Sequence, residues 1–331
     1  MCATTTQGAM PLSVANPSPG RARPVVSVIV PHLDDLAGLK ALMAALERQR
    51  FPRHAFEIIV ADNGSRDGVD AVKAVAGSAK VVTAVQKGAG PARNHALLHA
   101  KGGILAFTDS DCLPDPDWLQ AGVGALDAAD LAGGEMIVSI ASPGHPTPTE
   151  AFELVFAFDN QRYVQELNFS VTANLFARRA VAEAIGGFRT GVSEDLDWCQ
   201  RAVAHGFTLA YAADAIVQHP ARRNFPALSR KWRRLTQETL SLQAMRGQSR
   251  AGRLGKALMV LLSPAVQCTK VLRSPKLMGL SQKLGALGVL IRIRALRAWW
   301  MVQLESRSDA RTGPGQTADV PSLRVGSLSS S

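Results

Sequence analysis

Two aspartates, Asp109 and Asp111, directly follow an apolar run at Gly103–Thr108 and could bind a divalent cation. If the backbone is extended there, residues i and i+2 point to the same side, so both carboxylates face one spot while Ser110 points elsewhere. Two carboxylates in one place repel each other unless a cation lies between them. Such oxygen ligands suit Mg²⁺ or Mn²⁺, ions that complete their shell with substrate phosphates. A solvated turn with aspartate caps is the alternative interpretation.

Two further positions carry groups that could take part in catalysis. Ser193 can cap a helix predicted at Glu194–His205, where the helix dipole favours acids such as Asp195 in the first turn. Asp195 could instead act as a general base that takes a proton from a hydroxyl group. His219 follows a short apolar run; it is either structural or a Mn²⁺ ligand through its imidazole.

Strands and helices alternate along the first part of the chain. We expect strands at Val25–Val30, Phe56–Ala61, Lys80–Val85 and Gly103–Thr108, and helices at Leu36–Leu46, Pro91–Ala100 and Pro116–Ala129. This alternation predicts an α/β domain with a mostly parallel sheet. Ligands of such sheets gather beyond the carboxyl ends of the strands. Asp62 and the Asp109–Asp111 pair both follow strands, so we expect them to meet in one crevice.

The pattern changes after Gly133 and becomes less regular. Here we expect strands at Met136–Ile140, Val171–Ala177, Thr208–Ala212 and Ala215–Gln218, and helices at Glu150–Val164 and Glu194–His205.

Several segments, in their order along the chain, resemble those of family 2 glycosyltransferases over about Val25–Arg222. The resemblance lies in Val26–Pro31, Glu57–Ser65, Gly88–Asn94, Phe107–Asp111, Asn174–Arg178, Gly186–Phe188, the pair Glu194-Asp195 and His219. Each motif alone is weak, whereas the ordered set is specific. The resemblance implies a GT-A fold, with a Rossmann-like, mixed and mostly parallel sheet flanked by helices.

The same resemblance implies a reaction and a set of site residues. A sugar would pass from a nucleotide-diphosphate sugar to an acceptor hydroxyl by metal-assisted single displacement with inversion, with Asp195 as the base. It implies Mg²⁺ or Mn²⁺ held by Asp109, Asp111 and His219. The implied nucleotide-sugar contacts are Pro31, Asp34, Asp62, Arg93, Asp109 and Ser110, and the implied acceptor-side residues are Asn174, Gly187, Phe188, Glu194 and Trp198. Arg93 has a second interpretation, as a surface arginine of its helix.

The sequence departs from the family pattern after Pro31. Members usually continue with Thr or Ser, an aromatic residue and Asn, whereas this chain has His32-Leu33-Asp34. The nucleobase pocket lies near this point, so the base stays open. A dinucleotide-binding enzyme or a pyrophosphorylase would need a glycine-rich signature after the first strand, which is missing. A catalytically inactive relative is another alternative. The presence of Asp109, Asp111, Asp195 and His219 argues against it.

The C-terminal part of the chain is strongly basic. Arg222–Trp300 contains 17 Lys and Arg but one acidic residue, Glu238, so the net charge of +10 belongs to this segment and the remainder is acidic. Such a segment suits an anionic surface, and Ile291–Trp300 mixes arginines with apolar residues as interfacial helices do. The uncharged stretch Ala257–Thr269 is shorter than the roughly 20 residues of a membrane span.

Three alternatives to peripheral membrane attachment stay open for the basic segment. They are a spanning or re-entrant hairpin, a soluble helical cap, and a nucleic-acid-binding module. The last would interleave aromatic and basic residues, whereas the tryptophans here stand apart at Trp232 and Trp299-Trp300, so no nucleic acid is expected.

These observations divide the chain into four parts. We expect a disordered leader at 1–23, the glycosyltransferase domain at 24–225, a basic amphipathic helical region at 226–305 and a disordered tail at 306–331. The leader lacks the features of a signal peptide, and Cys2, Cys112, Cys199 and Cys268 show no metal or redox spacing. We therefore expect a cytoplasmic protein on the inner face of the cell membrane, with a glycan or lipid-linked acceptor.

Overall fold

The computed structural model describes residues 24–308, so the expected leader and residues 309–331 of the expected tail lie outside the described residues. The strands are β1 Val26–His32, β2 Phe56–Asp62, β3 Lys80–Thr83, β4 Ile104–Phe107, β5 Leu113–Pro114, β6 Leu131–Ser139, β7 Leu175–Arg178 and β8 Leu209–Pro220. The α-helices are α1 Leu36–Glu47, α2 Gly68–Ala76, α3 Ala89–Leu97, α4 Trp118–Ala125, α5 Pro148–Phe156, α6 Asn160–Leu167, α7 Arg179–Ile185, α8 Glu194–Ala204, α9 Phe225–Met245, α10 Arg250–Leu262, α11 Pro264–Arg273 and α12 Leu280–Ser308. Two short 3-10 helices are η1 Arg53–Ala55 and η2 Thr172–Asn174.

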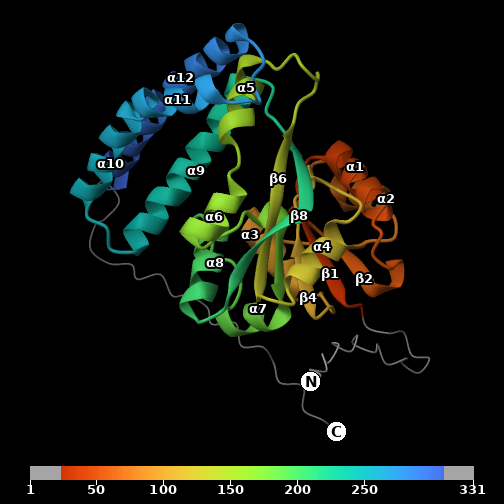
Figure 1. Cartoon of the computed structure of the whole chain (residues 1–331). Coiled ribbons are helices and arrows are strands. Elements are labelled where there is room, and N and C mark those ends of the chain that lie inside the picture. Colours follow the sequence, from red (N-terminus) through yellow and green to blue (C-terminus); the bar gives the residue numbers. More distant parts are fainter. Residues whose placement is uncertain (1–23, 309–331) are drawn as a thin grey trace, which may run out of the picture.

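One mixed sheet forms the centre of the protein, with strand order β3-β2-β1-β4-β7-β6-β8-β5. The first four strands pair in parallel, β7 runs antiparallel between β4 and β6, and β6 pairs with β8 in parallel. Figure 1 shows this sheet flanked by helices. The predicted α/β class is confirmed, because helical crossovers return each of the first strands to the same direction.

Apolar side chains cover both faces of the sheet. In β1, Val26, Val28 and Val30 pack with α1, α2 and α4 on one face, whereas Ile29 packs with α3, α7 and α8 on the other. A strand buried on both faces needs an apolar run without polar alternation, which explains why β1 lacks it. The same geometry brings the carboxyl ends of β1, β2 and β4 to one edge.

Three elements differ from those expected after Gly133. The single helix expected at Glu150–Val164 is two helices, because α5 ends at Phe156 and α6 begins at Asn160. The buried Asn160 side chain donates to the Gly134 carbonyl oxygen at 2.6 Å and so fixes the new helix start on β6. The two short strands expected between residues 208 and 218 are one strand, β8, which follows β6 through an irregularity at Gly134/Glu135.

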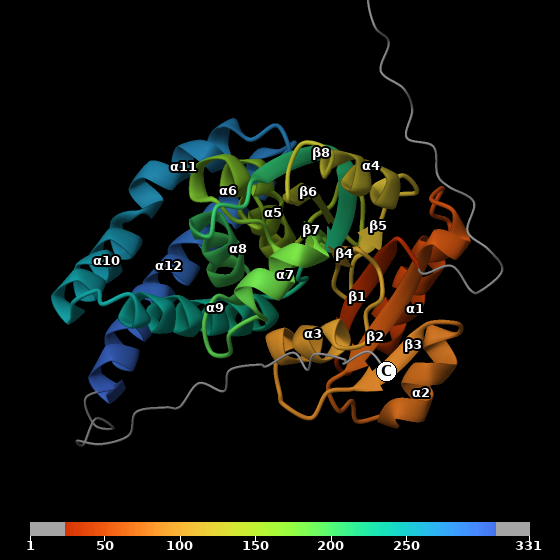
Figure 2. The same cartoon turned by 90° about the horizontal axis from the view of Figure 1, so that it is seen from below.

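The basic segment folds into α9–α12, which form a helical extension on the side of the molecule away from α1 and α2 (Figures 1 and 2). The extension shares a core with α5, in which Phe152 lies among Leu228 of α9 and Leu290 and Trp300 of α12. Gly285 lies where α12 comes close to α5, and a Cβ atom there would be 3.2 Å from Pro148, a tight contact. Among the described residues, no helix combines the length and apolarity that a membrane crossing requires.

Candidate active site

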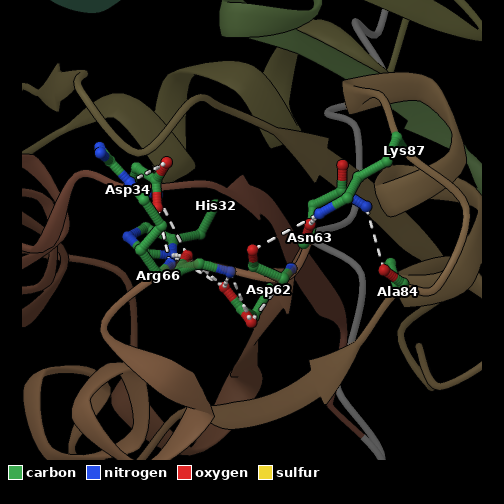
Figure 3. Close-up of polar contacts among 9 residues, drawn as sticks. His32, Asp34, Asp62, Asn63, Arg66, Ala84 and Lys87 are labelled. Carbon is green, nitrogen blue, oxygen red and sulfur yellow. Dashed lines mark hydrogen bonds and ion pairs between the residues drawn. The ribbon is translucent and has the colours of Figure 1, made fainter.

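A buried polar cluster closes the carboxyl ends of β1 and β2 (Figure 3). His32 and Asp62 are register partners in the parallel pair, and their Nδ1 and Oδ1 atoms lie 3.3 Å apart. Ser65 donates its hydroxyl to the same carboxylate at 2.5 Å. Burial pushes the pKa of Asp62 upward, but hydrogen bonds from Ser65, His32 and the Gly64 amide outweigh burial and keep the pKa below its ordinary value. Asp62 is therefore a carboxylate that holds the turn after β2.

Two loops are tied to this cluster by neighbouring residues. Asp34 has a φ of 56° and accepts from the Arg66 amide at 2.8 Å and from its Nε at 3.0 Å. Asn63 donates to the Ala84 carbonyl at 3.0 Å, while Lys87 donates to the Asn63 carbonyl at 2.6 Å (Figure 3). These bonds hold the segment before α3 against the end of β2.

Arg93 joins the two halves of the expected site. Its side chain is only 3% exposed; Nη2 donates to Asp109 at 2.6 Å and Nη1 to Glu194. Burial lowers the pKa of Arg93, but the negative charges of Asp109 and Glu194 outweigh burial and raise it. Asp109 after β4 and Glu194 at the start of α8 are thus separated by the width of one guanidinium group. The interpretation of Arg93 as a surface residue is wrong.

The segment at Asp109–Asp111 is a turn, not the extended backbone that the sequence suggested. Asp109 therefore faces Arg93, whereas Asp111 faces His219, with Oδ2 and Nε2 3.5 Å apart. Ser110 presents its carbonyl oxygen to α1, where a Cβ atom on Gly38 would approach it to 2.9 Å. Within residues 24–308, no three His, Cys, Asp or Glu side chains are gathered closely enough to hold a metal ion.

His219 is nevertheless held in the form that binds metals. Its Nδ1 lies 2.9 Å from the Pro220 carbonyl, which can only accept, so Nδ1 carries the proton and Nε2 has a free lone pair. Burial lowers the pKa of His219, although Asp111 opposes the shift. The lone pair of Nε2 thus faces a carboxylate oxygen. Because two such acceptors attract only through a cation or proton between them, Asp111 and His219 fit a divalent ion.

Asp195 lies in the first turn of α8, next to Glu194. Burial raises the pKa of Asp195 to about 6; the Leu196 amide, which donates to Oδ1 at 2.8 Å, opposes this, while the charge of Glu194 adds to it. A carboxyl with this pKa is mostly ionised at pH 7 but is a stronger base than an exposed aspartate. Such a shift is what general base catalysis requires.

Several expected contact residues are instead part of the core. Asn174 is fully buried and donates to the Glu135 and Ala215 carbonyls, while its Oδ1 accepts from Trp118. Trp198 is also fully buried. Pro31 is buried within β1. Asn174 and Trp198 have no exposed surface for a ligand, so we correct their roles to positioning; the Pro31 ring is likewise buried in the sheet.

The segment Gly187-Phe188 packs against the Arg93 side chain. Asn94 of α3 bonds to both backbone groups of Phe188, donating to the carbonyl at 2.8 Å and accepting from the amide at 2.7 Å. A Cβ atom on Gly187 would collide with Asn94 at 2.5 Å, which requires glycine there. The Phe188 ring lies 5.8 Å from the Arg93 guanidinium carbon. Phe188 is itself buried, so its ring packs in the apolar cluster beside Arg93 and does not meet a ligand.

Glu238 of α9 is a residue that our sequence interpretation did not include in the site. Burial raises the pKa of Glu238 to about 7; Arg234, at 3.8 Å, opposes this, and the charges of Glu194 and Asp195 raise it further. The extension therefore brings Glu238, the one acidic residue of Arg222–Trp300, to the acids of α8. Its isolation among 17 basic residues was the signal in the sequence.

Comparison with known proteins agrees with this fold. A family model described as glycosyl transferase family 2 matches residues 27–186. Glycosyltransferase AglE of Haloferax volcanii is 32% identical over 219 residues, which are 63% of this chain and 71% of that protein. A pre-mycofactocin glycosyltransferase of Mycobacterium tuberculosis is 28% identical over 224 residues, 63% of this chain and 46% of the longer relative.

Among solved structures, a mannosyltransferase from Pyrobaculum calidifontis, PcManGT, in complex with GDP-Man and Mn²⁺, shares the fold. The TM-score is 0.57 at 20% identity, covering 90% of this chain and 91% of that one. The chain thus has the GT-A fold. On the sequence matches, the chain belongs to glycosyl transferase family 2.

Replacing Arg93 tests the buried link. Arg93→Met should lower the free energy of unfolding by about 3–5 kcal/mol, because Asp109 and Glu194 are left facing each other without a cation. Arg162→Met is the matched control: it breaks an exposed ion pair with Glu166 and should leave the free energy of unfolding almost unchanged. Chemical denaturation of both variants measures the difference, and equal losses would contradict the assigned role.

Proposed function

We propose that this glycosyltransferase moves a sugar from a nucleotide-diphosphate sugar to an acceptor hydroxyl by a single displacement that inverts the anomeric centre. The observation that carries the proposal is the Arg93 bridge between Asp109 and Glu194. It brings the expected donor side and the expected acceptor side into one crevice at the carboxyl ends of the strands.

In this mechanism Asp195 is the general base. It takes the proton of the acceptor hydroxyl while that oxygen bonds to C1 of the sugar and the bond from C1 to the diphosphate oxygen breaks. A raised pKa of about 6 leaves the carboxylate ionised at pH 7 and makes it more basic. Arg93 keeps Glu194 in place beside Asp195. The Nη atoms of Arg93 are themselves fixed, because they donate to Glu194 and Asp109.

We further propose that Asp111 and His219, with the free oxygen of Asp109, hold Mg²⁺ or Mn²⁺. The opposed acceptor atoms of Asp111 and His219 support this, as does the presence of Mn²⁺ with GDP-Man in the related fold. When bound, such an ion neutralises negative charge on the leaving diphosphate. On the nucleotide side, the Asp62 turn and the loop carrying Asp34 are the proposed walls of the base pocket.

Asp195→Asn tests the base. Transfer should fall by a factor of about 10² or more, and the wild-type kcat/KM should rise with pH through an apparent pKa of about 6. Because burial disfavours the ionised form of Asp195, the Tm of the variant at pH 8 should be at least as high as that of the wild type. Any gain in Tm should vanish near pH 4, where Asp195 is protonated in the folded wild type. Asp127→Asn, an exposed control, should leave rate and pH profile unchanged. Full activity of Asp195→Asn would refute the role.

Metal removal tests the second part of the mechanism. Treatment with EDTA should stop sugar transfer, and added Mn²⁺ or Mg²⁺ should restore it. Asp111→Ala should lose transfer by about 10² or more even when the ion is in excess, because one ligand is missing. Transfer assays with a panel of nucleotide sugars supply the readout. A rate that EDTA leaves untouched removes the metal from the mechanism.

We also propose that the extension lies on an anionic membrane surface, which would give access to a lipid-linked or polysaccharide acceptor. Of the 19 large hydrophobic side chains that are exposed in residues 24–308, 13 lie in α9–α12 or the turns between them. On α10 and α11 they include Leu258, Leu262 and Val266, amid the basic residues of the segment. Exposed apolar groups with cations around them suit a lipid interface.

The surface that faces lipid in this proposal differs from the one expected. Ile291–Trp300 was expected to lie in the interface, but Ile293 and Trp300 are buried against other helices of the extension and α5. One face of α12 is thus covered by protein, and Ile291 and Trp299 remain on its outer side. The exposed residues of α10 and α11 form the broader candidate surface.

Vesicle binding tests the attachment. The double variant Leu258→Glu with Leu262→Glu should reduce partitioning onto phosphatidylglycerol vesicles by about tenfold or more, because two exposed leucines that would insert into the lipid are lost and two negative charges are gained. Leu98→Glu, at an exposed leucine near the end of α3, is the control and should bind as the wild type does. Co-sedimentation gives the partition coefficient. Equal binding of both variants would count against this surface.

A further inference from the structure

A cavity of about 280 Å³ lies between α9, α10, α11 and α12, inside the extension and apart from the active site. Its walls carry two arginines, Arg294 and Arg297 of α12, together with Lys256 of α10. Gln243 of α9 and Gln267 of α11 complete the polar lining. At roughly 30 Å³ for each water molecule, the cavity has room for a small polar group and some water.

Arg294 is only 9% exposed, and not all of its N–H donors have an acceptor. Nη2 donates to Gln267 at 2.8 Å, while the buried Nε has no partner. Arg297 donates only a long bond, 3.4 Å from Nε to the Thr236 hydroxyl oxygen. Both guanidinium groups lie over the Trp232 ring, 5.4 and 4.4 Å from its centre. Across residues 24–305, whose side chains are described, neither arginine has a carboxylate partner.

Three other cations of this protein that are partly or fully buried do have acidic partners. Arg253 forms a two-pronged pair with Glu305, and Lys231 pairs with Glu153 at 3.0 Å. Arg93 lies between two carboxylates. Burying a guanidinium group without an anion costs free energy, and here two such groups are neighbours that repel each other. Burial lowers the pKa of Arg297 to about 10, and Arg294 adds to this shift.

The unpaired donors point to an anion from outside the described chain. Two guanidinium groups and an ammonium group supply several N–H donors in one place, the arrangement that binds phosphate oxygens through charge-assisted, often two-pronged, bonds. Gln243 offers a buried oxygen without a hydrogen-bond partner, to which a P–OH group or water can donate. We propose that this cavity binds a phosphate group held by Arg294, Arg297 and Lys256.

The position of the cavity allows two sources for that phosphate. Met259 lines the cavity and is 71% exposed, so the cavity is not sealed on the α10 side. This is also the side on which α10 exposes its apolar residues. A free phosphate can enter there, and so can the phosphate of a lipid headgroup.

Thermal unfolding of the whole chain tests the proposal with inorganic phosphate as the probe, at constant ionic strength set by chloride. Wild type should show a rise in Tm of about 2–4 °C when phosphate reaches ten times its Kd, and above that the Tm should rise with the logarithm of the phosphate concentration. Arg294→Met and Arg297→Met should abolish the rise. Arg292→Gln, which removes an exposed arginine of the same helix, should keep it.

A vesicle-binding experiment distinguishes free phosphate from the phosphate of a lipid headgroup. Phosphatidylcholine vesicles receive equal negative charge from either phosphatidic acid or oleate, and the wild type should prefer phosphatidic acid several-fold if a headgroup is the source. Arg294→Met should bind both vesicles equally. A phosphate-dependent Tm or an Arg294-dependent lipid preference supports the site. If neither appears, or if the arginine variants respond as the wild type does, the proposal is overturned.

The stability of the variants separates a ligand site from a structural role. In phosphate-free buffer, Arg294→Met should unfold at the same temperature as the wild type or higher, because an unpaired buried charge is removed. A purely structural arginine predicts a lower Tm in every buffer. Arg297→Met provides the same comparison from the second guanidinium group, so a folding defect in one variant leaves the test intact.

Discussion

The site depends on one buried guanidinium group. Arg93 reaches 16 residues forward to Asp109 and 101 residues forward to Glu194, and it lies on an aromatic floor that Phe188 provides. Without it, the acids after β4 and those of α8 would repel each other across the crevice. The sheet, the Asn94 bonds and the glycine at Gly187 all serve to fix this group, so much of the catalytic domain is a support for a single charge arrangement.

Much of the fold followed from local sequence patterns. The β-branched runs at β1 and β2 predicted a parallel pair whose carboxyl ends lie at one edge of the sheet, and the pairing of His32 with Asp62 at that edge agrees. The contacts across the site did not follow from local patterns. Asn174 looks like a polar site residue in a list of motifs, but its amide braces β6 and β8 in the core. Glu238 could not be placed near Asp195, because only the packing of α9 brings them together.

The extension has two chemically different sides. Helix α9 directs Glu238 toward the acids of α8, whereas Thr236, Leu240 and Gln243 line the cavity. At 3.6 residues per turn these two sets lie on opposite faces of one helix. A single helix, roughly 10 Å across, therefore forms the partition between the acidic crevice and the arginine-lined cavity. The basic segment is thus an architectural part of the enzyme as well as a source of surface charge.

The shared core of α5 and the extension limits how this enzyme can be altered. Phe152 belongs by sequence to the catalytic part, yet its ring is covered by side chains from α9 and α12. A chain shortened at the start of α9 would expose this apolar face to water, at a cost of about 25 cal/mol for each Å² uncovered. The helices after β8 therefore cannot be moved to another catalytic domain by themselves. The recipient domain would need a helix with the same apolar face as α5.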